Sequence, residues 1–210
     1  MFLTYIVPLS ILFPLLIGLL NYKKADRAPR LLFFYLVVSG LINLSAMLLI
    51  QFRMRNLPLL HLYTLVEAIF IFAYFKTIFD DLCIKRILTY LMVIFPLLCI
   101  INFTFLQSIF SFNTYTRPLE AILITFFCLL YLYKSGFSEN WMKKEINWFN
   151  MGILMYFPVA CIIFILSNYL VFTSGNKAMN NMVWNLHATL VFVMYLIWTR
   201  AFSLIKSNGR

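Results

Sequence analysis

Seven long apolar stretches constrain the fold of this chain more than any other feature of its sequence. They cover residues 2–22, 31–51, 57–79, 87–106, 118–133, 146–172 and 182–205. A membrane-spanning helix needs about 20 mostly apolar residues, because the hydrocarbon core of a bilayer is about 30 Å thick. The stretches take up most of the 210 residues and leave no room for a separate soluble domain. We therefore predict an all-α membrane protein, a single seven-transmembrane helix bundle.

Composition agrees with a lipid environment. The chain is 63% hydrophobic and only 11% charged, whereas a soluble domain has about a quarter of its residues charged. The apolar runs are continuous, while the strands of a membrane barrel alternate between apolar and polar residues over about 10 positions. Helices are therefore favoured over strands.

Lysine and arginine are distributed unevenly between the two sets of loops. The poorer side has only Arg53, Arg55, Arg117 and Lys177. The richer side has thirteen cations: Lys23, Lys24, Arg27, Arg30, Lys76, Lys85, Arg86, Lys134, Lys143, Lys144, Arg200, Lys206 and Arg210. Cytoplasmic loops carry the excess of cations, so we expect the N-terminus outside and the C-terminus in the cytoplasm. The pattern suits a multi-pass protein of a bacterial cytoplasmic (inner) membrane, in contact with membrane lipids. It explains the net charge of +10 without nucleic-acid binding.

Polar residues inside the third stretch fall on one helical face. His61, Thr64 and Glu67 recur every three residues and span an arc of about 120°. With Leu57 at the outer boundary, Glu67 lies about 15 Å deep and His61 about 6 Å deep. An ionisable group near the midplane of a membrane is expected to face the bundle interior or a wet cavity and to be functional.

Other spans place polar groups at similar depths. Trp184 and His187 share one face of the seventh stretch, with Asn185 beside it, and Glu120 opens the fifth. We therefore predict an outward-facing cavity lined by spans two, three, five, six and seven. Its aromatic wall is expected to include Tyr63, Tyr115, Tyr156, Tyr169 and Trp184. The candidate ligand-binding residues are His61, Thr64, Glu67, Glu120, Trp184, Asn185 and His187.

Each candidate also has a structural interpretation. Glu67, His61 and His187 could serve only to hydrogen-bond one helix to another. Glu120, which follows Pro118, could stabilise the first turn of its helix through the helix dipole. Arg117 is interpreted as an interfacial anchor. The sequence leaves these alternatives open.

Motifs for metals, cofactors and catalysis are absent from the sequence. The chain has two histidines and four cysteines and no C-x-x-C pair, so a histidine-rich zinc site cannot be built. It has neither a G-x-S-x-G motif nor a glycine-rich phosphate loop. We predict no cofactor and no metal, and the sequence gives catalysis no support.

Three functions remain for such a bundle. The first is a sensor or receptor-like module that binds a small molecule or lipid and signals through a membrane or cytoplasmic partner. The second is a small-solute transporter with a three-plus-one-plus-three helix plan, because spans one to three and five to seven run in the same direction. The third is a membrane-embedded hydrolase that uses His61, Glu67 and His187.

Three segments carry a resemblance to a known group. They are Leu57-Pro-Leu-Leu-His-Leu-Tyr-Thr-Leu-Val-Glu67, Asn113-Thr-Tyr-Thr-Arg-Pro-Leu-Glu120 and Trp184-Asn-Leu-His187. With them the chain resembles, over nearly its whole length, a group of small seven-span inner-membrane proteins of Bacteroidota-type bacteria. The resemblance implies a connection with sensor-kinase signalling. It transfers no catalytic residue to this chain.

Overall fold

The computed structural model describes residues 6–136 and 140–205, and every regular element in them is helical. Seven helical segments in these residues are long and apolar enough to cross a membrane: Val7–Lys24, Arg27–Gln51, Leu57–Ile78, Leu82–Leu106, Thr116–Ser135, Glu145–Thr173 and Lys177–Ser203. The predicted all-helical bundle with seven membrane-length segments is therefore confirmed.

Several segments are composed of more than one helix. The first consists of α1 (Val7–Ser10), α2 (Leu12–Asn21) and a 3-10 turn. The second, third and fifth are single helices, α3 (Arg27–Gln51), α4 (Leu57–Ile78) and α6 (Thr116–Ser135). The fourth and sixth, α5 (Leu82–Ile101) and α7 (Glu145–Asn168), each continue into a π-helical turn, η3 (Asn102–Leu106) and η5 (Tyr169–Thr173). The seventh is α8 (Lys177–Ser203).

Several helices begin a few residues before the predicted spans. Helix α3 begins at Arg27 instead of residue 31, α5 at Leu82 instead of 87, and α8 at Lys177 instead of 182. In each case the extra residues include charged side chains, which lower the local hydropathy although the backbone is already helical. The predicted residues 2–5 of the first span lie outside the described part.

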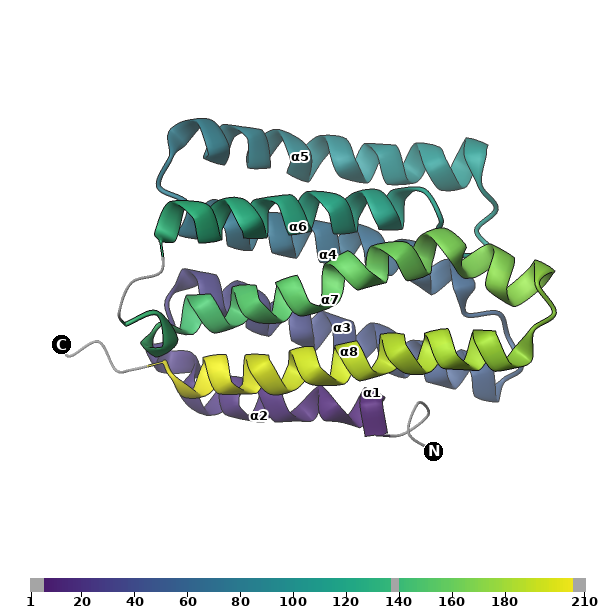
Figure 1. Cartoon of the computed structure of the whole chain (residues 1–210), viewed down its shortest axis with the longest axis horizontal. Helices are drawn as coiled ribbons and strands as arrows, with labels where there is room; N and C mark the ends of the chain where they lie inside the picture. The colour runs from purple at the N-terminus through teal and green to yellow at the C-terminus, as the bar shows by residue number, and fades with distance from the viewer. Residues whose placement is uncertain (1–5, 137–139, 206–210) are drawn as a thin grey trace.

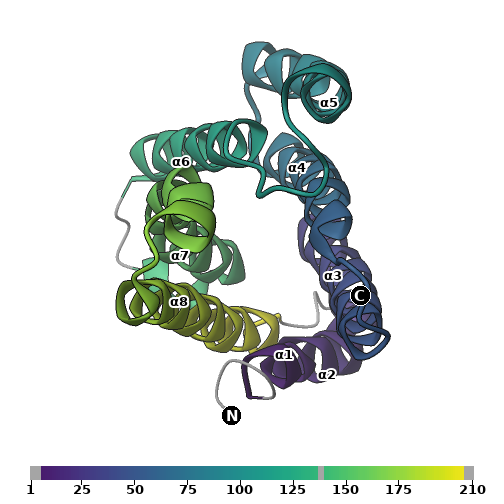
Figure 2. The same ribbon diagram turned by 90° about the vertical axis from the view of Figure 1, so that its right-hand side faces the viewer.

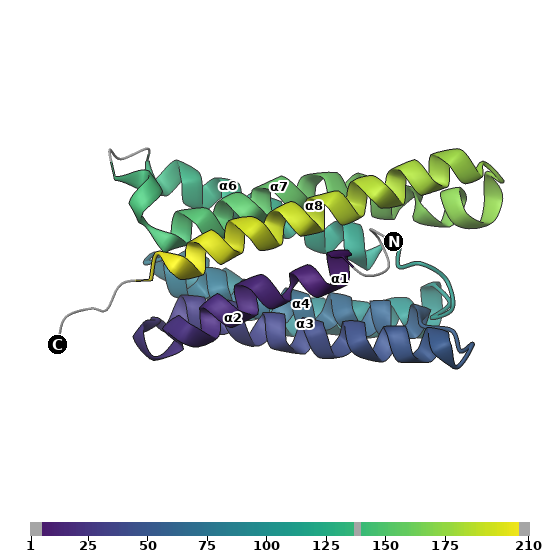
Figure 3. The ribbon, with the colours of Figure 1, turned by 90° about the horizontal axis from the view of Figure 1, so that it is seen from below.

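The segments form a ring of six, with α5 outside it. Around the ring α2 packs on α3, α3 on α4, α4 on α6, α6 on α7, α7 on α8, and α8 on α2. Helix α5 packs mainly on the outer side of α4 and stands apart from the ring (Figures 1 and 2). Figure 3 shows α1 and α2 on one side of the bundle, between α3 and α8.

The two ends of the bundle differ in character. We call the end with loops 52–56, 107–115 and 174–176 the cavity end, and the end with loops 25–26 and 79–81 and residues 140–144 the basic end (Figure 1). The centre and the basic half are filled by fully buried rings, and Phe149 packs on both Trp198 and Phe202. The rings of Phe72, Phe75 and Phe95 are also fully buried.

A polar cluster in the basic half is satisfied within the protein. Asn150 donates to the Tyr74 hydroxyl (3.0 Å) and to the Ile146 carbonyl (2.9 Å). Asn147 accepts from the Tyr131 hydroxyl (3.1 Å) and donates to the Trp141 carbonyl. These bonds join α4, α6 and α7, so this cluster serves to hold helices together.

Candidate functional site

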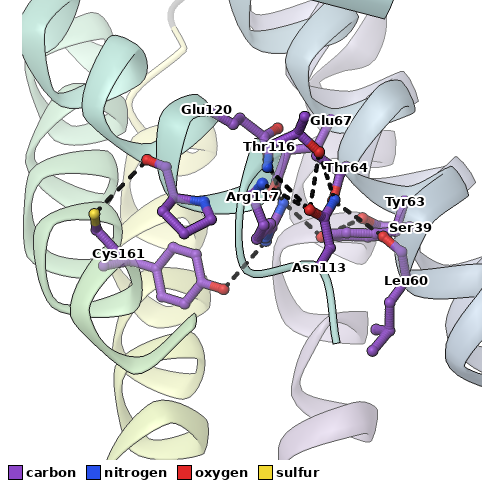
Figure 4. Close-up of polar contacts among 12 residues, drawn as sticks. Ser39, Leu60, Tyr63, Thr64, Glu67, Asn113, Thr116, Arg117, Glu120 and Cys161 are labelled. Atoms are coloured by element: carbon purple, nitrogen blue, oxygen red, sulfur yellow. Dashed lines mark hydrogen bonds and ion pairs between the residues drawn. The ribbon is translucent and has the colours of Figure 1, made fainter. Parts of the chain in front are cut away.

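Arg117 is the centre of a buried charged cluster. Its Nη1 donates to Oε2 of Glu67 on α4 and to Oε2 of Glu120, one turn further along α6, at 2.7 Å. All three side chains are at most 7% exposed. Figure 4 shows the side chains converging from the two helices. We call these three residues the Arg117 triad.

The start of α6 fixes the position of Arg117. Just before this helix, the side-chain oxygen of Asn113 accepts from the backbone N–H groups of Thr116 (3.0 Å) and Arg117 (3.3 Å). These are N–H groups that a helix start leaves without partners within the helix. The Asn113 amide lies near the Thr64 hydroxyl of α4 (3.4 Å). Local capping chemistry therefore holds Arg117 facing Glu67, fifty residues away.

The Arg117 triad has one positive group and two acidic groups, and their charges do not cancel. With both carboxylates ionised it carries a net charge of −1, and a buried uncompensated charge is costly. The second carboxylate oxygen of Glu120, Oε1, is buried and has no hydrogen-bond partner among the described residues. A proton or a cation taken up here would neutralise the triad.

Hydroxyl groups extend the triad to other helices. The Tyr35 hydroxyl donates to Oε1 of Glu67, and Tyr63 is bonded to Tyr35 (2.6 Å) and to Ser39 (3.0 Å). On the other side, Nη2 of Arg117 contacts the Tyr156 hydroxyl at 3.4 Å. That hydroxyl is bonded to Nε2 of His187 at 3.0 Å. One chain of polar contacts thus links α3, α4, α6, α7 and α8.

A cavity of about 280 Å³ lies beside the triad, in the half of the bundle nearer the cavity end. Residues of α3, α4, α6, α7 and α8 line it, which are the five predicted spans, and α1 adds Val7 and Pro8. Arg117 lines the wall, with the rings of Tyr63 and Phe164 packed on its guanidinium at 5.2 and 4.9 Å. The polar and aromatic wall also includes Thr64, Phe112, Asn113, Tyr156, Trp184 and His187.

The predicted ligand-binding residues divide into three groups. Thr64, Trp184 and His187 line the cavity. Glu67 and Glu120 are not part of its wall and reach it through Arg117. His61 and Asn185 do not line the cavity either.

His61 and Asn185 are placed away from the cavity for different reasons. The Nε2 of His61 is bonded to the Ser111 carbonyl at 3.1 Å, so this residue attaches α4 to the loop before α6. Asn185 is exposed on the outer surface of α8, because it is two positions, about 200° of helix rotation, from His187. Among the described residues His61, Glu67 and His187 make no hydrogen bond to one another: His61 is bonded to Ser111, Glu67 to Arg117 and His187 to Tyr156.

Three interpretations of the sequence need correction. Arg117 is not an interfacial anchor but is buried in the triad. Glu120 does not lie in the first turn of α6, because the helix begins at Thr116 and Glu120 is its fifth residue. Tyr115 and Tyr169 are exposed, at 61% and 55%, and do not form part of the cavity wall.

Comparisons with known proteins add no assignment: no protein family, no curated protein and no solved structure matches this chain.

Proposed function

We propose that this chain is a membrane receptor-like module that binds a small molecule or lipid in the cavity beside Arg117 and signals through a membrane or cytoplasmic partner. The observation that carries the proposal is a charged side chain lining an aromatic cavity inside the bundle. Ligand sites in proteins are typically concave and mostly apolar, with a few polar groups that orient the ligand.

The network behind the cavity supports a signalling role. A ligand that changes the hydrogen bonds of Arg117 acts on Glu67 and Tyr156, and through them on Tyr35 of α3 and His187 of α8. Tyr35 in turn packs against Trp198, at 5.9 Å between ring centres, in the aromatic core that leads toward the basic end. A change at the cavity therefore has a packed route to the other end of the bundle.

The same aromatic core supports binding without translocation. Below the triad, Phe72, Phe149 and Trp198 are fully buried and fill the interior between the cavity and the basic end. The cavity thus ends within the bundle. We further propose that the cavity end faces outward in a bacterial inner membrane, since the cation-rich loops lie at the other end.

A ligand screen by thermal unfolding tests this proposal, with a matched pair of variants on α8. His187→Ala removes a side chain from the cavity wall, whereas Asn185→Ala removes a polar side chain two positions away on the outer surface. A compound present at 100 times its Kd stabilises the protein by about 2.7 kcal/mol.

We expect a compound that raises the melting temperature of the wild type to act equally on Asn185→Ala and weakly on His187→Ala. If every stabilising compound acts equally on both variants, the cavity is not the binding site and the proposal is wrong.

A transporter is the second candidate, because six segments form a ring and the fourth, α5, stands outside it (Figure 2). This arrangement separates the chain into three, one and three helices. Uptake into sealed vesicles distinguishes the two functions. A receptor binds the compound found in the screen without accumulating it, while a transporter accumulates it in the vesicle lumen.

A further inference from the structure

An apolar groove adjoins the cavity on the side of α1 and α3. Its volume is about 360 Å³, and its walls come from α1 and α2 on one side and from residues 37–47 of α3 on the other. Many of the lining side chains are exposed, among them Leu9, Leu12, Leu41 and Leu44. The groove therefore presents an apolar surface to the lipid.

The groove and the cavity share two lining residues, Pro8 and Asn43. The two spaces therefore adjoin, one almost wholly apolar and the other containing Arg117. Asn43 has a side-chain amide at this boundary, and this amide makes no hydrogen bond to another residue in the described ranges. A polar group in such a place is costly unless a ligand or lipid headgroup satisfies it.

Hydrogen-bond donors predominate among the unused groups of the cavity wall. Trp184 and Tyr195 line the cavity, and neither the indole N–H of the first nor the hydroxyl of the second makes a hydrogen bond inside the described part of the chain. A guanidinium has five N–H groups. Arg117 donates three hydrogen bonds, to Glu67, Glu120 and Tyr156. Such a wall suits a ligand head rich in acceptor oxygens.

We propose that the ligand is a single-chain carboxylic acid, with its carboxyl group beside Arg117 and Trp184 and its hydrocarbon chain in the groove between α1 and α3. This inference rests on the proposed function and specifies its ligand class. The acid enters from lipid in its neutral form and brings its own proton. It therefore adds no charge to a triad that already carries two carboxylates for one guanidinium.

The test compares four probes on the purified protein in detergent: butyrate, decanoate, methyl decanoate and decyltrimethylammonium. We expect decanoate to bind most tightly, because each methylene removed from water adds about fourfold in affinity while the groove has room. Butyrate has the carboxyl group but lacks the long hydrocarbon chain. Methyl decanoate and decyltrimethylammonium have the long chain but no carboxylic acid group. Equal binding of decanoate, its methyl ester and the ammonium compound would overturn the assignment of a carboxyl head.

A substitution in the groove tests the position of the chain. Gly40 lines the groove, and a Cβ there meets only Ile11 Cδ1 at 3.9 Å. Gly40→Leu places a branched side chain in this space, and Gly40→Ala is the matched control that leaves most of it open. We expect Gly40→Leu to reduce decanoate affinity at least tenfold and to leave butyrate binding unchanged. Unchanged decanoate binding in Gly40→Leu would overturn the groove assignment.

The head position has its own variant. Trp184→Phe keeps an aromatic ring in the wall and removes the indole N–H, so we expect it to weaken butyrate and decanoate by a similar factor. If no acid binds but another compound does, and that compound is lost in His187→Ala, the carboxylic-acid inference fails and the receptor proposal stands. If no compound binds the wild type in a manner sensitive to His187→Ala, the receptor proposal fails as well.

Discussion

At the scale of single residues, the Arg117 triad places one cation and two carboxylates inside the bundle. Burying an ion pair costs desolvation that its attraction often only balances, whereas removing one partner leaves the other charge uncompensated. Glu67 makes more hydrogen bonds than Glu120: it accepts from Tyr35, Tyr63 and Arg117, while among the described residues Glu120 accepts from Arg117 alone. The two glutamates should therefore respond differently to substitution.

We expect Glu67→Leu to destabilise the protein by about 1–3 kcal/mol, because Arg117 keeps Glu120 as its counter-charge but Arg117 and Tyr35 both lose a buried acceptor. Glu120→Gln keeps the shape of its side chain and one acceptor oxygen, and should cost less than Glu67→Leu. Denaturant unfolding in detergent measures both. Equal losses for the two variants would contradict the unequal roles.

Replacement of the whole triad separates stability from function. We expect the variant Glu67→Leu, Arg117→Met, Glu120→Leu to be more stable than Glu67→Leu alone, because it also replaces the remaining buried Arg117–Glu120 ion pair by apolar side chains, which removes the desolvation cost of that pair. It should also lose every ligand found in the cavity screen. If instead the triple variant is the less stable of the two, the triad contributes net stability as an ion-pair network.

At the scale of helices, α7 and α8 pack closely against each other at Gly152. A Cβ at this position would lie 2.5 Å from Nε1 and 2.6 Å from Cδ1 of Trp198. The indole cannot move aside easily, because it is fully buried and its N–H donates to the Phe149 carbonyl at 3.1 Å. The packing of α7 on α8 therefore requires a residue without a side chain at position 152.

We expect Gly152→Ala to destabilise the protein by about 1–3 kcal/mol through overpacking. Gly40→Ala is the matched control on α3, where the new methyl group makes only an ordinary contact with Ile11. Thermal unfolding of the two variants under the same conditions measures the difference. A neutral Gly152→Ala would mean that α7 and α8 can separate without loss.

Asp81 connects two helices at the basic end. It caps α5 by accepting from the backbone N–H groups of Cys83 and Ile84, and it accepts from Lys134 of α6 at 2.8 Å. The Lys134 ammonium and these N–H groups lower the pKa of Asp81. The stability that these bonds contribute is therefore complete above the ordinary pKa of about 3.9 and is lost as pH falls through the lowered value.

We expect the melting temperature of the wild type to fall more steeply between pH 5 and 3 than that of Asp81→Asn. The difference should be small, since the pair is exposed to solvent. Asp80→Asn, at the exposed neighbouring position, is the control and should keep the steepness of the wild type. Identical pH profiles for all three proteins would show that the contact with Lys134 adds nothing.

At the scale of the whole molecule, the orientation of the bundle has a direct test in its cysteines. Cys83 is exposed at the basic end, whereas Cys99, Cys128 and Cys161 are buried. If the basic end is cytoplasmic, a membrane-impermeant maleimide should label Cys83 only after the cells are permeabilised. Lys177→Cys in a Cys83→Ser background places a thiol at the cavity end, and it should be labelled in intact cells.

Hydropathy and helical spacing predicted the seven spans, because a span must be apolar along most of its length to be stable in lipid. They also predicted that Glu67, Thr64 and His187 face the interior. They failed for Arg117, which lies at the end of an apolar run where an arginine normally reaches the surface. Its true environment depends on Glu67, fifty positions away, and no pattern within one helix reveals such a partner. The prediction that Asn185 lines the cavity rested on the rule that polar residues within a span face the interior. Asn185 does not follow this rule, because its side chain is exposed on the outer surface of α8.

The groove between α1 and α3 determines which concentration governs occupancy of the site. A ligand that arrives through this groove dissolves first in the bilayer, so its effective concentration is its mole fraction among the lipids. The apparent Kd in water should then rise in proportion to the amount of lipid present, while the Kd expressed per lipid molecule stays constant. The protein would report the composition of the membrane in which it lies.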